Sequence, residues 1–207
     1  MSNIWFTSDT HFHHKNIVKG VSDWNEGGQG TRDFKTLEEH DEHIISQFNK
    51  YVKEGDTLWH LGDWSFGGIE QIYRFYQRLN CKFVHIILGN HDHHIENNRE
   101  YNGIKAQDLF LSVRHVYFGK IGGRTFYLSH FAHRVWNKSH HGVIHLYGHS
   151  HDTLDNTGLE WGKSMDVSLE SSLRYFGEMR PFDIDHIGRI MDKRSALIVD
   201  HHNSKTN

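Results

Sequence analysis

Short apolar runs that end in polar turns dominate the pattern of this chain. Residues 3–8, 57–61 and 82–88 are rich in aliphatic and aromatic side chains, and a polar turn follows each run. Runs of this length predict strands that are buried on both faces. Further strands are predicted at 113–118, 124–128, 143–147 and 164–169, the first two as a hairpin around residues 120–123.

Helical periodicity appears between these strands. Thr36 and Glu39 form a capping-box pattern at the start of a helix whose apolar positions, ending at Val52, fall on one face. Residues 69–79 are amphipathic, and Asp183 suits the N-cap of a helix over 183–194. Strands alternating with helices predict an α/β fold.

Two segments carry weaker patterns. Residues 20–34 form a long, Gly-rich polar loop, a candidate substrate loop or mobile flap. Residues 93–103 are polar, and we expect them to be irregular. No repeat or linker divides the chain, so we expect a single domain over 1–207 with a frayed C-terminal end.

Composition narrows the class of protein. The net charge is −3, which gives no sign of a strongly basic nucleic-acid-binding surface. Cys81 is the single cysteine, no signal peptide is evident, and no run reaches the roughly 20 apolar residues that span a bilayer. We therefore expect a cytoplasmic protein without a membrane partner. The 21 histidines stand out, because histidine is the commonest metal ligand.

Metal-capable side chains follow five of the predicted strands. In extended chain, positions i and i+2 share a side, so paired donors can hold one ion together. The α/β folds place ligands at the carboxyl ends of strands. The strand-end residues are Asp9 and His11; Asp63; Asn90, His91 and Asp92; His130; and His149 and His151.

The donor types indicate a particular metal chemistry. Carboxylate, amide and imidazole donors without thiolates favour Mn²⁺, Fe, Zn²⁺ or Ni²⁺. The number of donors exceeds the need of one ion and suits a two-metal centre, whose ions lie about 3.5–4 Å apart and share a carboxylate. Centres of this kind serve the hydrolysis of phosphate esters.

As a set, these motifs resemble the calcineurin-like metallophosphoesterases, in particular their small bacterial and bacteriophage members. The resemblance covers residues 9–151 and rests on Asp9-x-His11, Gly62-Asp63, Gly89-Asn90-His91-Asp92, Ser129-His130 and Gly148-His149-Ser150-His151. It implies a four-layer αββα sandwich in which helices flank two mixed sheets. It also implies a hydrolase with two divalent ions, most simply Mn²⁺.

The resemblance further implies a role for each residue. Asp9, His11 and His151 would bind the first ion, and Asn90, His130 and His149 the second, with Asp63 bridging both. A metal-activated water would attack phosphorus. His91 would act as the general acid, and Asp92 would orient His91.

Differences from one branch of the family narrow the class of substrate. The phosphoprotein phosphatase branch has an arginine after the bridging aspartate and ends its motif in Glu, whereas Asp63 is followed by Trp64-Ser65-Phe66-Gly67-Gly68 and the motif ends in Asp92. We therefore favour phosphodiesters of nucleotides or related small esters. The alternatives are a phosphomonoesterase, a nuclease acting on nucleic-acid ends, and a metal-bound scaffold without catalysis.

Several residues near the motifs are candidates for substrate contact. Cationic or imidazole side chains that could reach a phosphate are His14, Lys15, Arg32 and Arg134. Three loop tryptophans could stack on a ring, although ordinary packing is the favoured interpretation: Trp24, Trp64 and Trp136.

Overall fold

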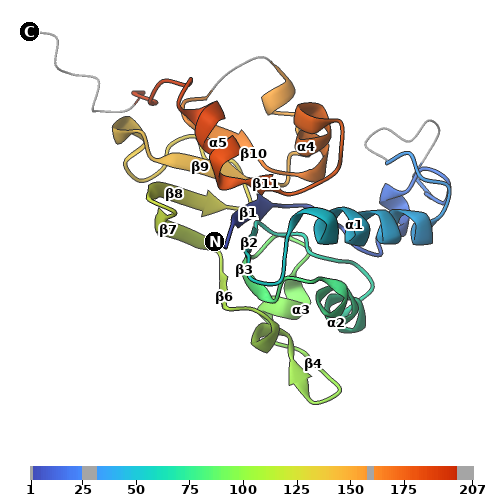
Figure 1. Cartoon of the computed structure of the whole chain (residues 1–207). Coiled ribbons are helices and arrows are strands. Elements are labelled where there is room, and N and C mark those ends of the chain that lie inside the picture. Colours follow the sequence, from blue (N-terminus) through green and yellow to red (C-terminus); the bar gives the residue numbers. More distant parts are fainter. Residues whose placement is uncertain (1, 25–31, 158–160, 200–207) are drawn as a thin grey trace, which may run out of the picture.

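The computed structural model describes residues 2–24, 32–157 and 161–199 and contains two main β-sheets flanked by helices (Figure 1). The first sheet, in the order β11-β1-β2-β3-β6, comprises β1 (Ile4–Thr7), β2 (Thr57–His60), β3 (Phe83–Ile87), β6 (Ser112–Arg114) and β11 (Phe182–Asp183). The second, in the order β10-β9-β8-β7, comprises β7 (Val116–Ile121), β8 (Arg124–Ser129), β9 (Ile144–Tyr147) and β10 (Ser164–Asp166).

Helices and a small hairpin complete the described part of the chain. The α-helices are α1 (Leu37–Tyr51), α2 (Ile69–Arg78), α3 (His93–Glu96), α4 (Leu169–Phe176) and α5 (Ile184–Met191). Strands β4 (Glu100–Tyr101) and β5 (Ile104–Lys105) form a hairpin that projects from the body in Figure 1. Among the described residues, no helix combines the length and the apolar character needed to cross a membrane.

Burial on both faces explains the apolar runs of the first sheet. Trp5, Leu58 and Val84 lie side by side on neighbouring strands and pack in one core with α1 and α2. The next positions, Phe6 and Trp59, belong to a second core shared with β8 and β9 of the other sheet. Helix α5 contributes to this second core, so the predicted arrangement of two sheets flanked by helices is confirmed.

The helix starts follow the predicted capping chemistry. The Thr36 side chain accepts a hydrogen bond from the Glu39 N–H at the start of α1, and Glu39 in turn accepts from the Lys35 N–H. The Asp183 side chain accepts from the His186 N–H at the start of α5. Caps of this kind each contribute about 1 kcal/mol to stability.

Three of the predicted elements differ from the structure. The predicted strand 113–118 is divided at His115: β6 pairs with β3 of the first sheet, whereas β7 pairs with β8 of the second. The predicted hairpin is thus confirmed only from residue 116 onward. The chain changes sheets at this point, and periodicity cannot show which sheet a strand joins.

The other two differences lie in shorter elements. Residues 93–103 are not irregular, because they contain α3, β4 and the start of the turn to β5. The strand predicted over 164–169 ends at Asp166, because Ser168 caps α4 by accepting from the Ser171 N–H. Within the predicted loop 20–34, residues 25–31 lie outside the described part of the chain.

Strand direction places the predicted site. Strands β1, β2 and β3 run parallel, so their carboxyl ends deliver Asp9, Asp63 and Asn90 to one edge of the first sheet. Strands β8 and β9 also run parallel, and His130 and His149 follow their carboxyl ends. The carboxyl ends from both sheets meet at one common site, described next.

Candidate metal centre

Three of the predicted ligands form a first group after β1 and β9. His11 Nε2 lies 3.1 Å from His151 Nε2 and 3.8 Å from Asp9 Oδ1, and His151 Nε2 lies 3.7 Å from the same Asp9 oxygen. Asp9 and His11 are buried, and His151 is partly buried. Two imidazole nitrogens and a carboxylate oxygen therefore converge on one point, as in a site for a divalent cation.

A second group lies beside the first. One potential ligand atom from each of Asp63, His130 and His149 lies within 4.8 Å of the others. Asn90 Oδ1 completes the group, at 3.1 Å from His130 Nε2 and 3.0 Å from His149 Nδ1. The structure thus brings all seven predicted ligands together, in the two groups that the family resemblance implies.

Asp63 lies between the two groups. Its Oδ2 atom is 3.6 Å from His11 Nε2 in the first group and 3.6 Å from His130 Nε2 in the second. Its Oδ1 atom accepts a hydrogen bond from the His91 N–H at 3.0 Å. Because this bond fixes the carboxylate, one oxygen faces both sets of imidazoles, which is the geometry of a shared ligand.

Hydrogen bonds outside the groups support metal binding. His130 Nδ1 lies 2.7 Å from the Leu61 carbonyl and donates to it, which leaves the Nε2 lone pair directed into the second group. The Asp9 carboxylate is fully buried and accepts from the His149 N–H. Burial raises the pKa of Asp9, and the nearby Asp63 carboxylate adds to this effect. A divalent cation in each group would stabilise the ionised carboxylates against burial and against their mutual repulsion. The donor set therefore fits two such ions.

The backbone is strained at most of these ligands. Asp9, His11, Asp63, His149 and His151 have φ angles between 45° and 65°. Residues other than glycine rarely adopt this left-handed region, and they persist there only when the surrounding structure holds them. Strain of this kind clusters at functional sites, which agrees with the location of the two groups.

Two glycines allow the strand-end loops to approach the carboxylates. A Cβ atom at Gly89 would lie 2.2 Å from Asp63 Oδ1, and one at Gly148 would lie 2.4 Å from Asp9 Oδ2. Real Cβ atoms do not approach oxygen this closely, so any other residue would displace a ligand. These contacts give a steric reason for the glycine in each of the Gly-Asn-His-Asp and Gly-His-Ser-His motifs.

The two predicted catalytic residues are placed differently from each other. His91 is exposed and lines the cleft above the two groups. Asp92 is buried, and its carboxylate accepts from the backbone N–H groups of Asp63, Trp64 and Gly89 at 2.8–3.0 Å. Asp92 thus holds the loops that carry Asp63 and Asn90, and its predicted role in orienting His91 stays a prediction.

Arg32 is also placed differently from the prediction. It was a candidate for substrate contact, but its guanidinium is buried and donates to the carbonyls of Asp9 and Thr10 at 2.6 and 2.8 Å. Its Nε donates to Glu170 Oε1 at 2.9 Å, and Glu170 Oε2 lies 3.1 Å from His151 Nδ1. Arg32 thus supports the first group from behind.

Glu170 is the residue that sequence reasoning missed. It lies in the first turn of α4, and its carboxylate contacts both Arg32 and the ligand His151. Burial opposes its ionisation, but the charge of the Arg32 guanidinium and the hydrogen bond with His151 hold the pKa of Glu170 below its usual value. A carboxylate behind a histidine commonly orients the ring toward a metal. No motif of the sequence marks this position.

Of the three remaining candidates for substrate contact, His14 lines the cleft above the two groups, whereas Lys15 and Arg134 are not among its described lining residues. The cleft has a volume of about 560 Å³, and His14 lines it together with His91, Asn90 and His151. Lys15 forms an exposed ion pair with Asp23 and is not among the described lining residues. Arg134 lines a separate cavity of about 450 Å³ beside Trp161.

The tryptophans also differ in position. Trp64 and Trp136 are buried in the core, as the packing interpretation predicts. Trp24 is 48 % exposed and lines the cleft.

Comparison with known proteins agrees with this geometry. Gene 66 protein of Mycobacterium phage L5 is 30 % identical over 180 residues, covering 74 % of this chain and 80 % of that protein. Gene 66 protein of Mycobacterium phage D29 is 27 % identical, covering 83 % and 89 %. The crystal structure of a protein of unknown function from Aquifex aeolicus has the same fold, with a TM-score of 0.60 and 19 % identity, covering 92 % of this chain and all of that one.

A family model also matches most of the chain. The model described as calcineurin-like phosphoesterase matches residues 2–187, which include every residue of both groups. On this match, together with the two groups of metal-capable side chains, the chain belongs to the calcineurin-like phosphoesterase family.

Proposed function

We propose that this protein is a two-metal phosphodiesterase. Membership of the family implies a phosphoric ester hydrolase. The observation that carries the proposal is the position of Asp63 Oδ2, which lies 3.6 Å from an imidazole nitrogen of each group. Two divalent ions at such a centre lower the pKa of water and neutralise the phosphoryl oxygens.

The side chains of the chain then have distinct tasks. Asp9, His11 and His151 would hold one ion, and Asn90, His130 and His149 the other, with Asp63 shared. His91 would donate a proton to the leaving oxygen, since its ring is exposed to the cleft beside both groups. Its backbone N–H independently holds Asp63, so a change of the His91 side chain leaves that contact in place.

The charge of the cleft supports a diester over a monoester. Among its described lining residues there is neither Lys nor Arg. A phosphomonoester carries close to two negative charges at neutral pH, and Arg or Lys clamps commonly stabilise phosphoryl groups. A diester carries one charge, which the two ions can balance. Mn²⁺ is the proposed ion, with Fe, Zn²⁺ and Ni²⁺ as competitors.

Hydrolysis of two chromogenic esters tests the proposal. With Mn²⁺ we expect a higher kcat/KM for bis-p-nitrophenyl phosphate than for p-nitrophenyl phosphate, and no activity in EDTA. For a diester whose leaving group is an alkoxide, which must take a proton as it departs, His91→Gln should lower kcat about 100- to 10,000-fold, the range for loss of a general acid, while Mn²⁺ affinity by calorimetry stays unchanged. Parallel assays with Zn²⁺, Ni²⁺ and Fe²⁺ identify the preferred ion.

Two results would contradict parts of this assignment. Wild-type activity of His91→Gln on a diester with an alkoxide leaving group would remove the general-acid role. A higher kcat/KM for the monoester would show that the protein is a phosphomonoesterase, despite the absence of Lys and Arg from the described lining.

A further inference from the structure

One side of the cleft is built from stacked rings. The Phe66 ring lies parallel to the His14 ring, with centroids 3.6 Å apart and planes 7° apart. The Trp24 ring meets His14 edge-on at 5.6 Å and is 48 % exposed. All three residues line the cleft, and we call them the aromatic wall: His14, Trp24 and Phe66.

The wall lies beside the proposed general acid. The Phe66 ring centroid is 4.6 Å from that of His91 and 5.4 Å from that of His11 in the first group. A phosphate bound at the two groups would therefore have the wall next to the ester oxygen that His91 protonates. The wall would then lie on the side of the leaving group.

Backbone contacts hold the wall in position. The Phe66 N–H donates to the Phe12 carbonyl at 2.7 Å, and the Phe12 N–H donates to the Trp64 carbonyl. Phe12 and Ser65 thus form a parallel bridge between the loop after β1 and the loop after β2. Because Phe12 is fully buried, this bridge is anchored in the core and fixes the position of Phe66 in the wall.

The chemistry of the wall matches a planar heterocycle. Flat aromatic faces bind bases by stacking, which contributes a substantial part of affinity for single bases. Polar side chains that can bond to base edges or ribose hydroxyls line the same cleft: Asn16, Ser150 and Thr153. The absence of Lys and Arg from the described lining suits a neutral leaving group better than an anionic one.

We propose, resting on the proposed phosphodiesterase function, that the leaving group is a nucleoside whose base stacks on the aromatic wall. In the reaction, water supplies the new oxygen on phosphorus and the bond from phosphorus to the nucleoside oxygen breaks. The nucleoside departs as the alcohol after taking a proton from His91, and the second ester group stays on the phosphate.

A pair of diesters that differ only in the base tests this assignment. The substrates are thymidine 5′-(methyl phosphate) and its abasic analogue, 1,2-dideoxyribose 5-(methyl phosphate), each assayed with the Mn²⁺-loaded full chain. Phosphorus NMR separates the two routes of cleavage. We expect thymidine and methyl phosphate as products, and a kcat/KM about tenfold higher with the base than without it.

Variants locate the source of the preference. Phe66→Leu should reduce the ratio of the two kcat/KM values toward one, and Trp24→Leu, at an exposed position, should lower it without a risk to folding. Phe118→Leu is the matched control, because Phe118 is 40 % exposed on β7 and does not line the cleft. Calorimetry with Mn²⁺ checks that the metal sites of each variant are intact.

The outcomes separate this inference from the function on which it rests. Thymidine 5′-monophosphate and methanol as products, equal rates for the two substrates, or a ratio unchanged in both wall variants would overturn the inference alone. If neither substrate nor bis-p-nitrophenyl phosphate is hydrolysed with any of the metals, the proposed function fails as well.

Discussion

Replacement of Glu170 by Gln tests whether the first ligand group depends on a carboxylate behind it. The change keeps the shape of the side chain but removes its charge. The Glu170 carboxylate lies 2.9 Å from Arg32 Nε and 3.1 Å from His151 Nδ1. The Arg32 side chain is 1 % exposed and the Glu170 side chain 22 %. The pair is therefore poorly screened by solvent.

The size of the effect follows from these contacts. A hydrogen bond to a charged group contributes about 1.5–3 kcal/mol and a neutral one about 1 kcal/mol, so Glu170→Gln should lower the free energy of unfolding by about 0.5–2 kcal/mol. Loss of a supporting carboxylate typically weakens metal affinity about 10- to 100-fold. We expect this weakening for one of two Mn²⁺ ions, because Glu170 contacts only the first group.

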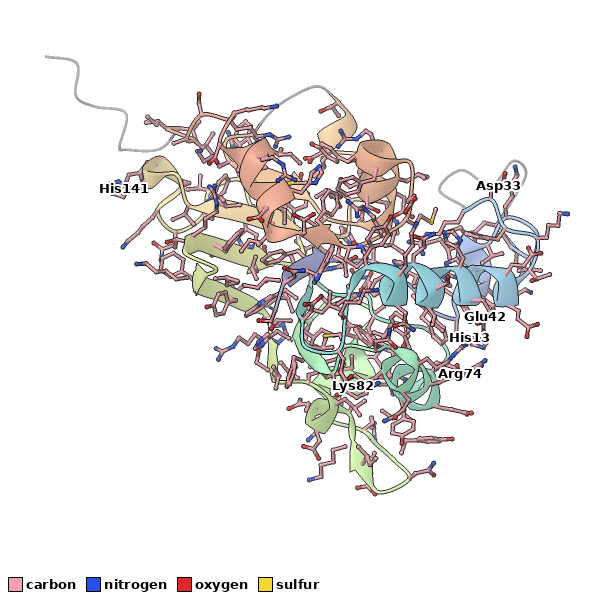
Figure 2. The ribbon with its side chains drawn as sticks, in the orientation of Figure 1. His13, Asp33, Glu42, Arg74, Lys82 and His141 are labelled. Carbon is pink, nitrogen blue, oxygen red and sulfur yellow. The ribbon has the colours of Figure 1, made fainter. Side chains whose placement is uncertain are left out.

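Urea denaturation in EDTA measures the stability, and calorimetry measures the Mn²⁺ affinity. Glu42→Gln is the matched control, since Glu42, labelled in Figure 2, lies on α1 and forms an exposed pair with Arg78. Exposed pairs contribute about 0–1 kcal/mol, so this variant should differ little from wild type in both measurements. Equal Mn²⁺ affinity in Glu170→Gln and wild type would refute a positioning role for Glu170.

Three further predictions concern the loops and the core. Gly148→Ala places a methyl group against Asp9 and should lower kcat at least about 100-fold, whereas Gly55→Ala, with open space around its Cβ position, should match wild type in the same assay. Asp92→Asn replaces one acceptor oxygen by an NH₂ donor that faces a backbone N–H, so the loops should shift and activity and Mn²⁺ affinity should fall together. Loss of activity with unchanged Mn²⁺ affinity would instead support a role of Asp92 in orienting His91. Burial lowers the pKa of His145 to about 3 from 6.5, so the unfolded chain binds a proton that the folded chain excludes. Stability should therefore decrease as the pH falls below 6.5, by up to about 1.4 kcal/mol per unit from this residue, and urea titrations between pH 5 and 7 should show a shallower dependence in His145→Gln; equal slopes would contradict the assignment.

The candidate metal centre could be predicted largely because its donors are local features of the sequence. Asp9, Asp63 and Asn90 each follow an apolar run, and parallel strands carry such positions to one edge. Capping residues such as Thr36 are equally local, because the side chain bonds within its own first turn.

The features that were missed depend on distant parts of the chain. Glu170 meets Arg32 across 138 positions, and no spacing rule connects them. The exchange of sheets at His115 depends on which edge strand is free in the folded protein. The backbone contacts of Asp92 were missed because they join it to Asp63 and Trp64, which lie 29 and 28 positions away in the sequence.

The left-handed backbone at five of the seven ligand positions has an evolutionary consequence. Each such residue costs the folded state about 1–2 kcal/mol, whereas glycine adopts the same conformation without that steric strain. Mutations to glycine at His11, His149 or His151 would thus relieve strain while removing a donor. In a lineage no longer selected for hydrolysis, these histidines should be among the first residues to disappear. Glycines at these positions in a homologue would mark a protein that retained the fold and lost the chemistry.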